Sequence, residues 1–216
     1  DAVDFITKKA SPKLTALLRT KPYYSAAALV QSYKAHVLCL LEGSTGALYH
    51  ASDSVLAPLD DVQARLLREL VLSQDEAFLK YNLAPLGLRR DIAMLGLLYK
   101  CVHGLAHPDL CALFARSTAA WTARAARTAE ARHEDQLVDP LPRLRLDSSR
   151  RSLLGLPRVY NLLPKEVVQK ASVSCFQSAL TSLARDLCRQ GYPDWPRRFS
   201  PRSSHHVLMA RPCVRR

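Results

Sequence analysis

The chain has 216 residues and a formal net charge of +12, and 48% of its residues are hydrophobic. This length suffices for one globular domain with a sizeable core, or for a smaller domain with tails. No apolar run approaches the roughly 20 residues of a membrane span, and no signal peptide stands at the start. We therefore expect an intracellular protein, cytoplasmic or nuclear, that is neither secreted nor membrane-bound. Because the chain begins with Asp1 rather than Met, we also expect it to be a fragment.

The positive charge is concentrated in the second part of the chain. Residues 1–85 carry 9 basic and 9 acidic side chains, whereas residues 86–216 carry 22 basic and 10 acidic ones. Most of those 22 are arginines, and the planar guanidinium donates several hydrogen bonds to a phosphate at once. The excess favours a polyanionic partner such as RNA or DNA, and a merely solubilising face is the alternative.

The cysteines give no sign of a metal or redox motif. They stand at wide, uneven spacings without a C-x-x-C pair: Cys39, Cys101, Cys111, Cys175, Cys188 and Cys213. We expect them to be reduced and to serve as small apolar side chains.

The first half of the chain has the three-to-four spacing of apolar residues that is typical of amphipathic helices. A first helix is predicted over residues 3–17, with Pro12 kinking or splitting it. A second is predicted from about Ser25 to Leu41, with Gly43 just past its end.

Further helix starts follow along the chain. Asp60 or Asp61 is expected to cap a third helix, and residues 73–76 have the capping-box pattern of a fourth. A fifth is predicted over residues 89–103, and His107 before a proline predicts one more start.

The second half changes in composition. An Ala/Arg/Pro-rich stretch over residues 116–150 is interpreted as a mobile basic connection, with residues 137–146 as a short extended piece. Apolar periodicity resumes over residues 151–190, and Gly191 is a helix stop. The last residues are rich in Pro, Arg and Ser and predict a disordered tail. The expected organisation is a helical domain, a connection, a helical segment and a basic tail: residues 5–115, 116–150, 151–190 and 191–216.

No strand alternation is strong enough to build a sheet. The predicted fold class is therefore all-α, an irregular bundle of about six to eight helices.

Candidate catalytic and metal-binding residues do not form recognisable sites. The spacing C-x-H-x3-H-x3-C of Cys101, His103, His107 and Cys111 is not a standard zinc pattern, and a buried thiol with a helix-capping histidine is the favoured interpretation. Phosphate-binding glycine loops and nucleophile elbows are missing from the sequence. No catalytic residue, metal, cofactor or small-molecule substrate is predicted.

The adjacent Asp60 and Asp61 invite comparison with the paired aspartates of polymerases. Such a pair needs a preceding tyrosine and a tight turn between strands so that two carboxylates converge on Mg²⁺. Here the pair follows Pro58-Leu59 and opens a helical pattern, which favours helix capping over catalysis.

Basic residues in two clusters are the candidates for contact with nucleic acid. They are Arg89, Arg90, Arg124, Arg127, Arg143, Arg145, Arg150 and Arg151. Phosphate contacts by such side chains would give a salt-sensitive affinity. An ordinary solvated face with an arginine-rich linker explains the same pattern. Few aromatic residues beyond Trp121 lie between these arginines, so base stacking has little support from the sequence.

Several segments occur in an order that a known family shares. The first two are residues 8–19, with the runs KKASPKL and LLR, and residues 29–38 (LVQSYKAHVL) with Glu42 after them. Next come residues 58–70, with PLDDVQ and REL, and the most distinctive stretch, residues 81–96 (YNLAPLGLRRDIAMLG). Residues 159–168 (VYNLLPKEVV) and the pattern S-x-x-x-F-x-x-x-L over residues 172–180 complete the set.

Together these segments resemble the region after the polymerase palm in non-LTR (LINE-type) retrotransposon polyproteins. The resemblance covers roughly residues 5–190. It implies a thumb-like helical region that supports template and primer handling beside an upstream reverse-transcriptase domain.

The resemblance also limits what this chain is expected to do. The polymerase aspartates and the endonuclease of a full-length element would lie upstream, so this chain is expected to be no enzyme, although its parent would be an RNA-directed DNA polymerase. We expect packing against that upstream domain and contacts to RNA or DNA backbone. The alternative is a stand-alone helical protein-interaction module derived from a decayed retroelement.

Overall fold

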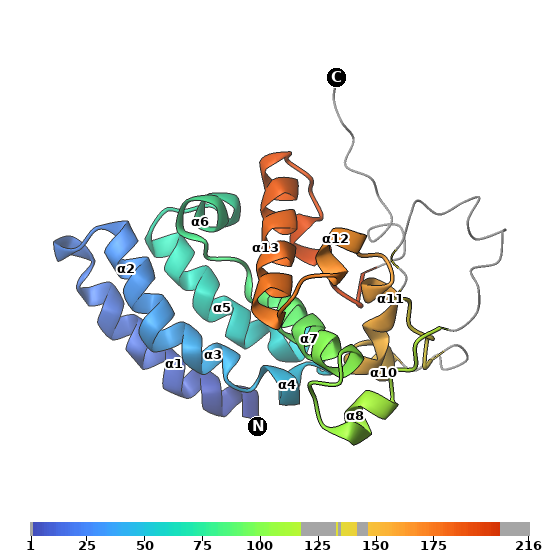
Figure 1. Ribbon diagram of the computed structural model, residues 1–216. Coiled ribbons are helices and arrows are strands. Elements are labelled where there is room, and N and C mark those ends of the chain that lie inside the picture. The colour runs from blue at the N-terminus through green and yellow to red at the C-terminus, as the bar shows by residue number, and fades with distance from the viewer. Residues whose placement is uncertain (1, 118–132, 134, 142–146, 204–216) are drawn as a thin grey trace. The chain divides into compact units, whose positions relative to one another are not determined.

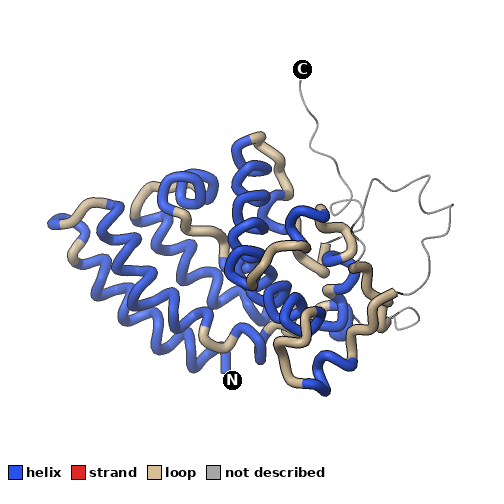
Figure 2. The backbone as a smooth tube through the Cα atoms, viewed as in Figure 1, coloured by secondary structure: helices blue, strands red, loops and turns tan. Residues whose placement is uncertain are grey.

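The computed structural model describes residues 2–117, 133, 135–141 and 147–203 (Figure 1). The regular secondary structure of the described residues is helical (Figure 2). An isolated antiparallel β-bridge joins Arg116 and Leu137. The predicted all-α class is confirmed.

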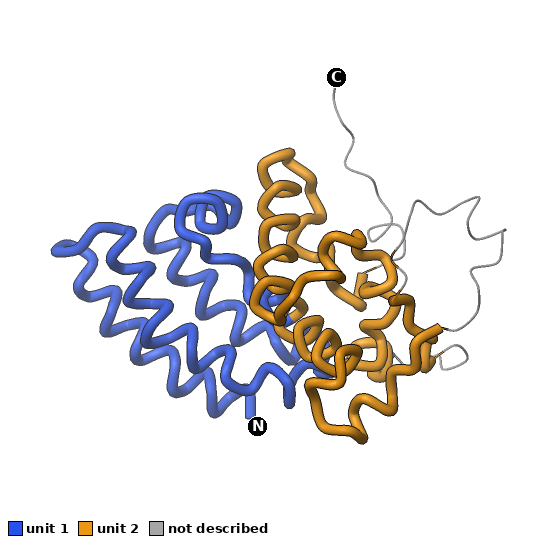
Figure 3. The backbone as a smooth tube through the Cα atoms, viewed as in Figure 1, with its two compact units in different colours: residues 1–90 blue, residues 91–216 orange. Residues whose placement is uncertain are grey.

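The chain forms two compact units, Asp1–Arg90 and Asp91–Arg216, which we call unit 1 and unit 2 (Figure 3). The division falls within one helix, α7 (Leu86–Val102). This division into two units differs from the four ranges that composition predicts, and the predicted ranges stay a prediction.

Unit 1 is built largely from long helices around one apolar core. Its elements before α7 are α1 (Ala2–Arg19), η1 (Lys21–Tyr23), α2 (Ala26–Tyr33), the π-helical turn η2 (Lys34–Leu38), α3 (Cys39–Glu42), α4 (Thr45–Leu48), α5 (Asp53–Glu69) and α6 (Gln74–Tyr81). In Figure 1, α1 lies alongside α2, α3 and α5, and it packs against all three. The core forms because the spaced apolar residues of each helix face the same interior.

The first helix is longer and less interrupted than the sequence indicated. Val3, Ile6, Ala10 and Leu14 are buried on one face of α1, as predicted. Pro12 does not split the helix, which continues to Arg19. Its ring lies on the exposed side, where the backbone carbonyl that it leaves without a helical partner can face water.

The prediction that Asp60 or Asp61 caps a helix is wrong. Both lie inside α5, which begins at Asp53 with Ser52 as its N-cap, the Ser52 hydroxyl accepting from the Val55 amide at 3.4 Å. Pro58, which the sequence places just before the expected helix start, lies inside α5.

Two other predicted helix starts are confirmed. Ser25 caps α2, and Ser73 and Glu76 form a reciprocal capping box at the start of α6. That box satisfies two amides that a helix start otherwise leaves unpaired.

Unit 2 contains the rest of α7, one further long helix and several single-turn helices. After α7 come α8 (Pro108–Ala112), α10 (Asp147–Arg150), η3 (Leu153–Gly155), α11 (Pro157–Tyr160), α12 (Lys165–Val168), α13 (Val173–Arg189) and η4 (Trp195–Arg197). Ser172 caps α13, and Gly191 follows its end at φ +68°, the left-handed conformation that glycine adopts readily.

Aromatic rings form the centre of unit 2. Tyr99 stacks on Phe176 with ring centroids 4.7 Å apart, and Tyr160 packs against the same phenylalanine. His133 meets Tyr160 edge to face at 5.3 Å and is 3% exposed. Helices α7, α11 and α13 thereby share one buried cluster with a residue of the predicted connection.

The described part of the predicted connection is fixed by side-chain bonds to backbone. The Asn161 amide oxygen accepts from the Leu137 N–H at 2.9 Å, and its nitrogen donates to the Leu137 carbonyl at 2.8 Å. Leu137 and Leu141 are buried. Of the expected extended piece, Leu137 forms the isolated bridge to Arg116, and the rest stays a prediction. Residues 118–132, 134 and 142–146 lie outside the described residues.

Residues 192–203, which composition assigned to a disordered tail, are folded, and the prediction is wrong for them. Trp195 and Phe199 are each 3% exposed, and Arg202 pairs with the buried Asp91 at 3.9 Å. Burial of the Trp195 and Phe199 side chains stabilises this segment although the residues around them are rich in Pro and Arg. Residues 204–216 are not among the described residues.

Candidate nucleic-acid interface

The eight predicted arginines fall into three groups. Arg124, Arg127, Arg143 and Arg145 lie outside the residues that the structure describes. Arg89 and Arg90 belong to unit 1, and Arg150 and Arg151 belong to unit 2. The prediction that they contact phosphate stays a prediction, but the surroundings of four of them are now known.

Arg89 is engaged by an acidic residue of its own unit. Its Nη2 donates to Glu42 Oε2 at 3.0 Å, and its Nε donates to the other carboxylate oxygen, so the pair is bidentate. Both side chains are about one-third exposed. The bond joins the start of α7 to the end of α3, two segments that sequence separates by 47 positions.

Arg90 is the least exposed of the four predicted arginines that the structure describes. Its side chain is 7% exposed, and Nη2 donates to both carboxylate oxygens of Asp60 at 2.7 and 2.9 Å. Its Nη1 is buried and has no hydrogen-bond partner among the described residues. Partial burial raises the pKa of the Asp60 carboxyl above its ordinary value, and the Arg90 guanidinium opposes that rise. Arg90 therefore has almost no surface to present to a phosphate.

A buried polar chain lies close to these ion pairs. The Tyr33 hydroxyl approaches the Gln63 amide oxygen at 3.5 Å, and Gln63 donates to the Ala84 carbonyl at 3.0 Å. Burial, with the nearby charge of Glu42, raises the pKa of Tyr33 well above its usual range. These hydrogen bonds hold the backbone at Ala84, just before α7, against α2 and α5, so their role is structural.

Arg150 and Arg151 differ from each other. Arg150 is exposed at the end of α10, whereas the Nε of Arg151 is buried without a hydrogen-bond partner in the described part of the chain. Among the four predicted arginines that the structure describes, Arg150 is therefore the one whose side chain is most exposed to solvent.

A basic cavity that the sequence analysis did not single out lies in unit 1. Its volume is about 330 Å³, within the range of roughly 300–1,000 Å³ usual for ligand sites. It is lined by Lys21, Arg65, Arg68, Glu69 and Val71. The spacing of Arg65 and Arg68, three residues apart on one helix, was a signal that the sequence offered. Lys21 joins them only through the fold, more than 40 positions away.

The residues weighed for metal binding are occupied in other ways. His103 stacks on Tyr99 at 4.0 Å, His107 caps α8, and Cys111 donates to the Ala106 carbonyl. Nowhere among the described residues do three histidine, cysteine, aspartate or glutamate side chains gather as metal ligands would. None of the helices that the structure describes is long and apolar enough to cross a membrane.

Comparison with known proteins adds no relative. No family model, no curated protein and no solved structure matches this chain.

Proposed function

We propose that this chain is a non-catalytic helical region of a non-LTR retrotransposon reverse transcriptase. In this proposal it packs beside the polymerase domain and contacts the backbone of RNA or DNA. The observation that carries the proposal is the ordered set of family-like segments over residues 5–190.

The contacts of unit 1 support this assignment. Three of the family-like segments are joined there by charge: Arg89 and Arg90 of one segment bind Glu42 and Asp60 of the other two. Residues at these motif positions therefore pair with one another in the folded unit, which agrees with the three segments belonging to one structural region.

The proposal is tested by the salt dependence of nucleic-acid binding. The full chain is titrated into a short labelled single-stranded RNA at low and at physiological salt, with fluorescence anisotropy as the measurement. Because each neutralised phosphate releases counterions, affinity should fall steeply as salt rises. Absence of binding at low salt would contradict the nucleic-acid part of the proposal.

The packing part needs a separate experiment. The chain should co-purify with a polymerase domain of a non-LTR element expressed in the same cells. Leu110 and Leu113, at the end of α8, are 36% and 50% exposed, and replacing both by Ser tests whether these apolar side chains are needed. If the wild-type chain does not associate with that domain, the packing role fails. If the variant associates as well as the wild type, these two leucines are not needed for packing.

A second candidate function is favoured by one feature of unit 2. Leu113 and Val138 are 50% and 49% exposed, and the Val138 amide donates to the Ala115 carbonyl two residues from Leu113. Exposed apolar side chains that gather in one region are typical of a protein-binding face. A stand-alone interaction module would bind a protein through this face and show no salt-sensitive affinity for RNA.

A further inference from the structure

We propose that the cavity of unit 1 between η1 and the end of α5 binds single-stranded nucleic acid, with the phosphate in the cavity and bases stacked on Tyr23 and Tyr24. This inference rests on the proposed function and places its nucleic-acid contact at residues outside the predicted arginine clusters.

The charge of the cavity favours an anion. Lys21, Arg65 and Arg68 supply three positive charges, and Glu69 supplies one negative charge. Lys21 lies 3.8 Å from the Glu69 carboxylate and also donates to the Glu69 carbonyl, so it is partly neutralised. Arg65 uses Nη1 for a 3.1 Å bond to the Thr15 hydroxyl, which orients its guanidinium and leaves its other donors for a ligand.

Arg68 is the side chain best placed to meet a phosphate. It is exposed, and no ion pair or hydrogen bond of its guanidinium occurs with the residues that the structure describes. Together with Arg65 it presents planar donors from one side of α5, the arrangement in which arginine binds phosphate bidentately.

Two exposed aromatic side chains closely follow Lys21 in the chain. Tyr23 is 83% exposed and Tyr24 is 60% exposed, one after the other in the turn that contains Lys21. Pro22 restricts that turn, and the Tyr23 amide donates to the Thr20 carbonyl at 2.9 Å. Two tyrosines that remain exposed on a restrained turn are available for stacking, which needs unpaired bases.

Val71 forms an apolar edge of the same cavity. It is 86% exposed and has φ +52°, a conformation that a β-branched residue rarely adopts. The position follows the end of α5, where glycine is the usual residue. The cavity thus combines cationic donors with an apolar edge, and two exposed tyrosines follow Lys21 in the chain. This combination matches a nucleotide better than a simple inorganic anion.

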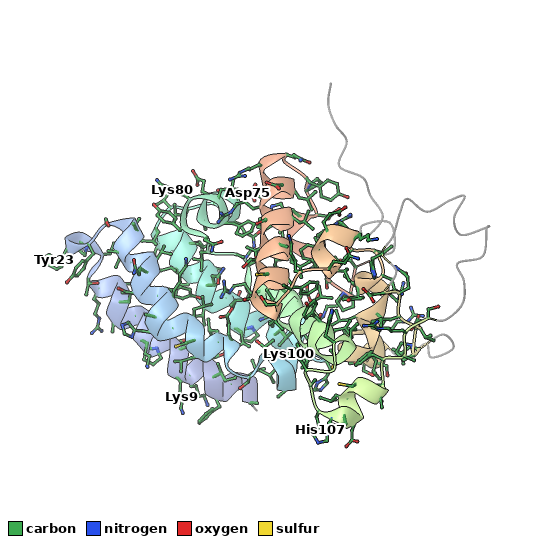
Figure 4. The ribbon with its side chains drawn as sticks, in the orientation of Figure 1. Lys9, Tyr23, Asp75, Lys80, Lys100 and His107 are labelled. Carbon is green, nitrogen blue, oxygen red and sulfur yellow. The ribbon has the colours of Figure 1, made fainter. Side chains whose placement is uncertain are left out.

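The experiment measures binding of the full chain to a short labelled single-stranded RNA, with single-stranded DNA and duplex DNA as further probes. Replacing Arg65 and Arg68 by Gln should weaken RNA binding about tenfold at low salt, and should lower the salt slope by about 1.4, since each phosphate contact on a single strand contributes about 0.7. The matched control replaces Lys8 and Lys9 by Gln. It removes the same charge from α1 roughly 10 Å before Thr15, the contact of Arg65, and should leave affinity nearly unchanged. Figure 4 shows Lys9 well apart from Tyr23.

Two further variants separate the roles within the cavity. Tyr23→Ala with Tyr24→Ala should weaken RNA binding about tenfold, whereas the corresponding Phe variants should bind like the wild type, because a phenyl ring still stacks. Glu69→Gln should strengthen binding about threefold by releasing Lys21 for a phosphate. A gain at Glu69 and losses at the other positions cannot all arise from unfolding.

Two single variants, Arg68→Gln and Arg65→Lys, separate weaker binding from unfolding of the chain. Arg68 is exposed, so its replacement should leave the melting temperature unchanged while it weakens binding. Arg65→Lys keeps the charge but loses the planar donor pair, so it should bind more weakly than the wild type and more tightly than Arg65→Gln.

The outcomes distinguish this site from the broader proposal. If the chain binds RNA but the Arg65/Arg68 and Lys8/Lys9 variants have equal affinities, this site is overturned and the proposed function survives. Tighter binding of duplex than of single strands, unaffected by the tyrosine changes, also overturns it. If the wild-type chain does not bind any nucleic acid at low salt, this site and the nucleic-acid part of the proposed function fail together, while the packing part is decided by the co-purification experiment.

Discussion

The two units of this chain are stabilised in different ways. In unit 1, long helices bury apolar stripes in one shared core, and a buried leucine such as Leu66 owes its place to non-directional burial. In unit 2, short segments are fixed by bonds from single side chains to distant backbone, such as Asn161 to Leu137 and Tyr99 to Lys170. A structure that depends on directional bonds and close backbone approaches should be more sensitive to the loss or gain of single atoms.

The largest expected effect tests the close approach in unit 2. A Cβ on Gly155 would lie 1.9 Å from the Arg150 carbonyl oxygen, a backbone atom that cannot rotate away. Gly155→Ala should therefore lower the free energy of unfolding by about 3 kcal/mol, measured by denaturant titration.

The matched control is Gly87→Ala in α7, where a Cβ would meet no atom within 4 Å. This change should be neutral or stabilise by up to about 1 kcal/mol, because alanine is the better helix former. Equal effects at the two glycines would contradict the comparison between the units.

The next effect concerns the bonds that hold the described part of the connection. Asn161→Ala removes both hydrogen bonds to the buried Leu137 backbone and should destabilise by about 2–3 kcal/mol. Hydrogen exchange should show the Leu137 amide losing protection. Asn161→Asp keeps the acceptor for that amide but turns a carboxylate oxygen toward the Leu137 carbonyl, so it should not rescue stability. Unchanged protection in the alanine variant would show that these bonds do not hold the segment.

A smaller effect is expected for a directional bond within unit 1. Arg90→Met should destabilise by about 1–2 kcal/mol, because it leaves Asp60 without its partner although that carboxylate is still 45% exposed. A double-mutant cycle with Asp60→Asn measures the coupling between the two side chains. RNA affinity should not change, and a large loss of affinity without a loss of stability would assign Arg90 to the interface instead.

The smallest expected effect has the opposite sign. Val71→Gly should stabilise unit 1 by about 1 kcal/mol, since glycine adopts positive φ without the strain of a β-branched side chain. Asn82 has the same φ of 52° and is the control: Asn82→Gly should change stability by only a few tenths of a kcal/mol, because asparagine tolerates this conformation. A lower melting temperature for Val71→Gly would mean that the valine makes a stabilising contact despite its exposure.

The candidate site shows where sequence reasoning reached its limit. Arg89 and Arg90 are adjacent basic residues at a helix start, which predicted a phosphate contact, yet both face carboxylates of unit 1. Sequence does not reveal such a pairing, because Glu42 and Asp60 lie 47 and 30 positions away. The cavity at Lys21 was missed for the same reason, as its basic residues come from segments far apart in the chain.

The sequence by itself determined the all-α class, the buried faces of the long helices and their capping residues Ser25, Ser73 and Gly191. These features depend on residues within a few positions of one another, so periodicity and local hydrogen bonding suffice to predict them. Only the tertiary structure decided that Pro12 and Pro58 lie inside helices and that residues 192–203 fold. It also decided which charges are paired and which remain available. Those outcomes depend on which side of an element faces water and on partners brought from distant positions, and neither is encoded in local pattern.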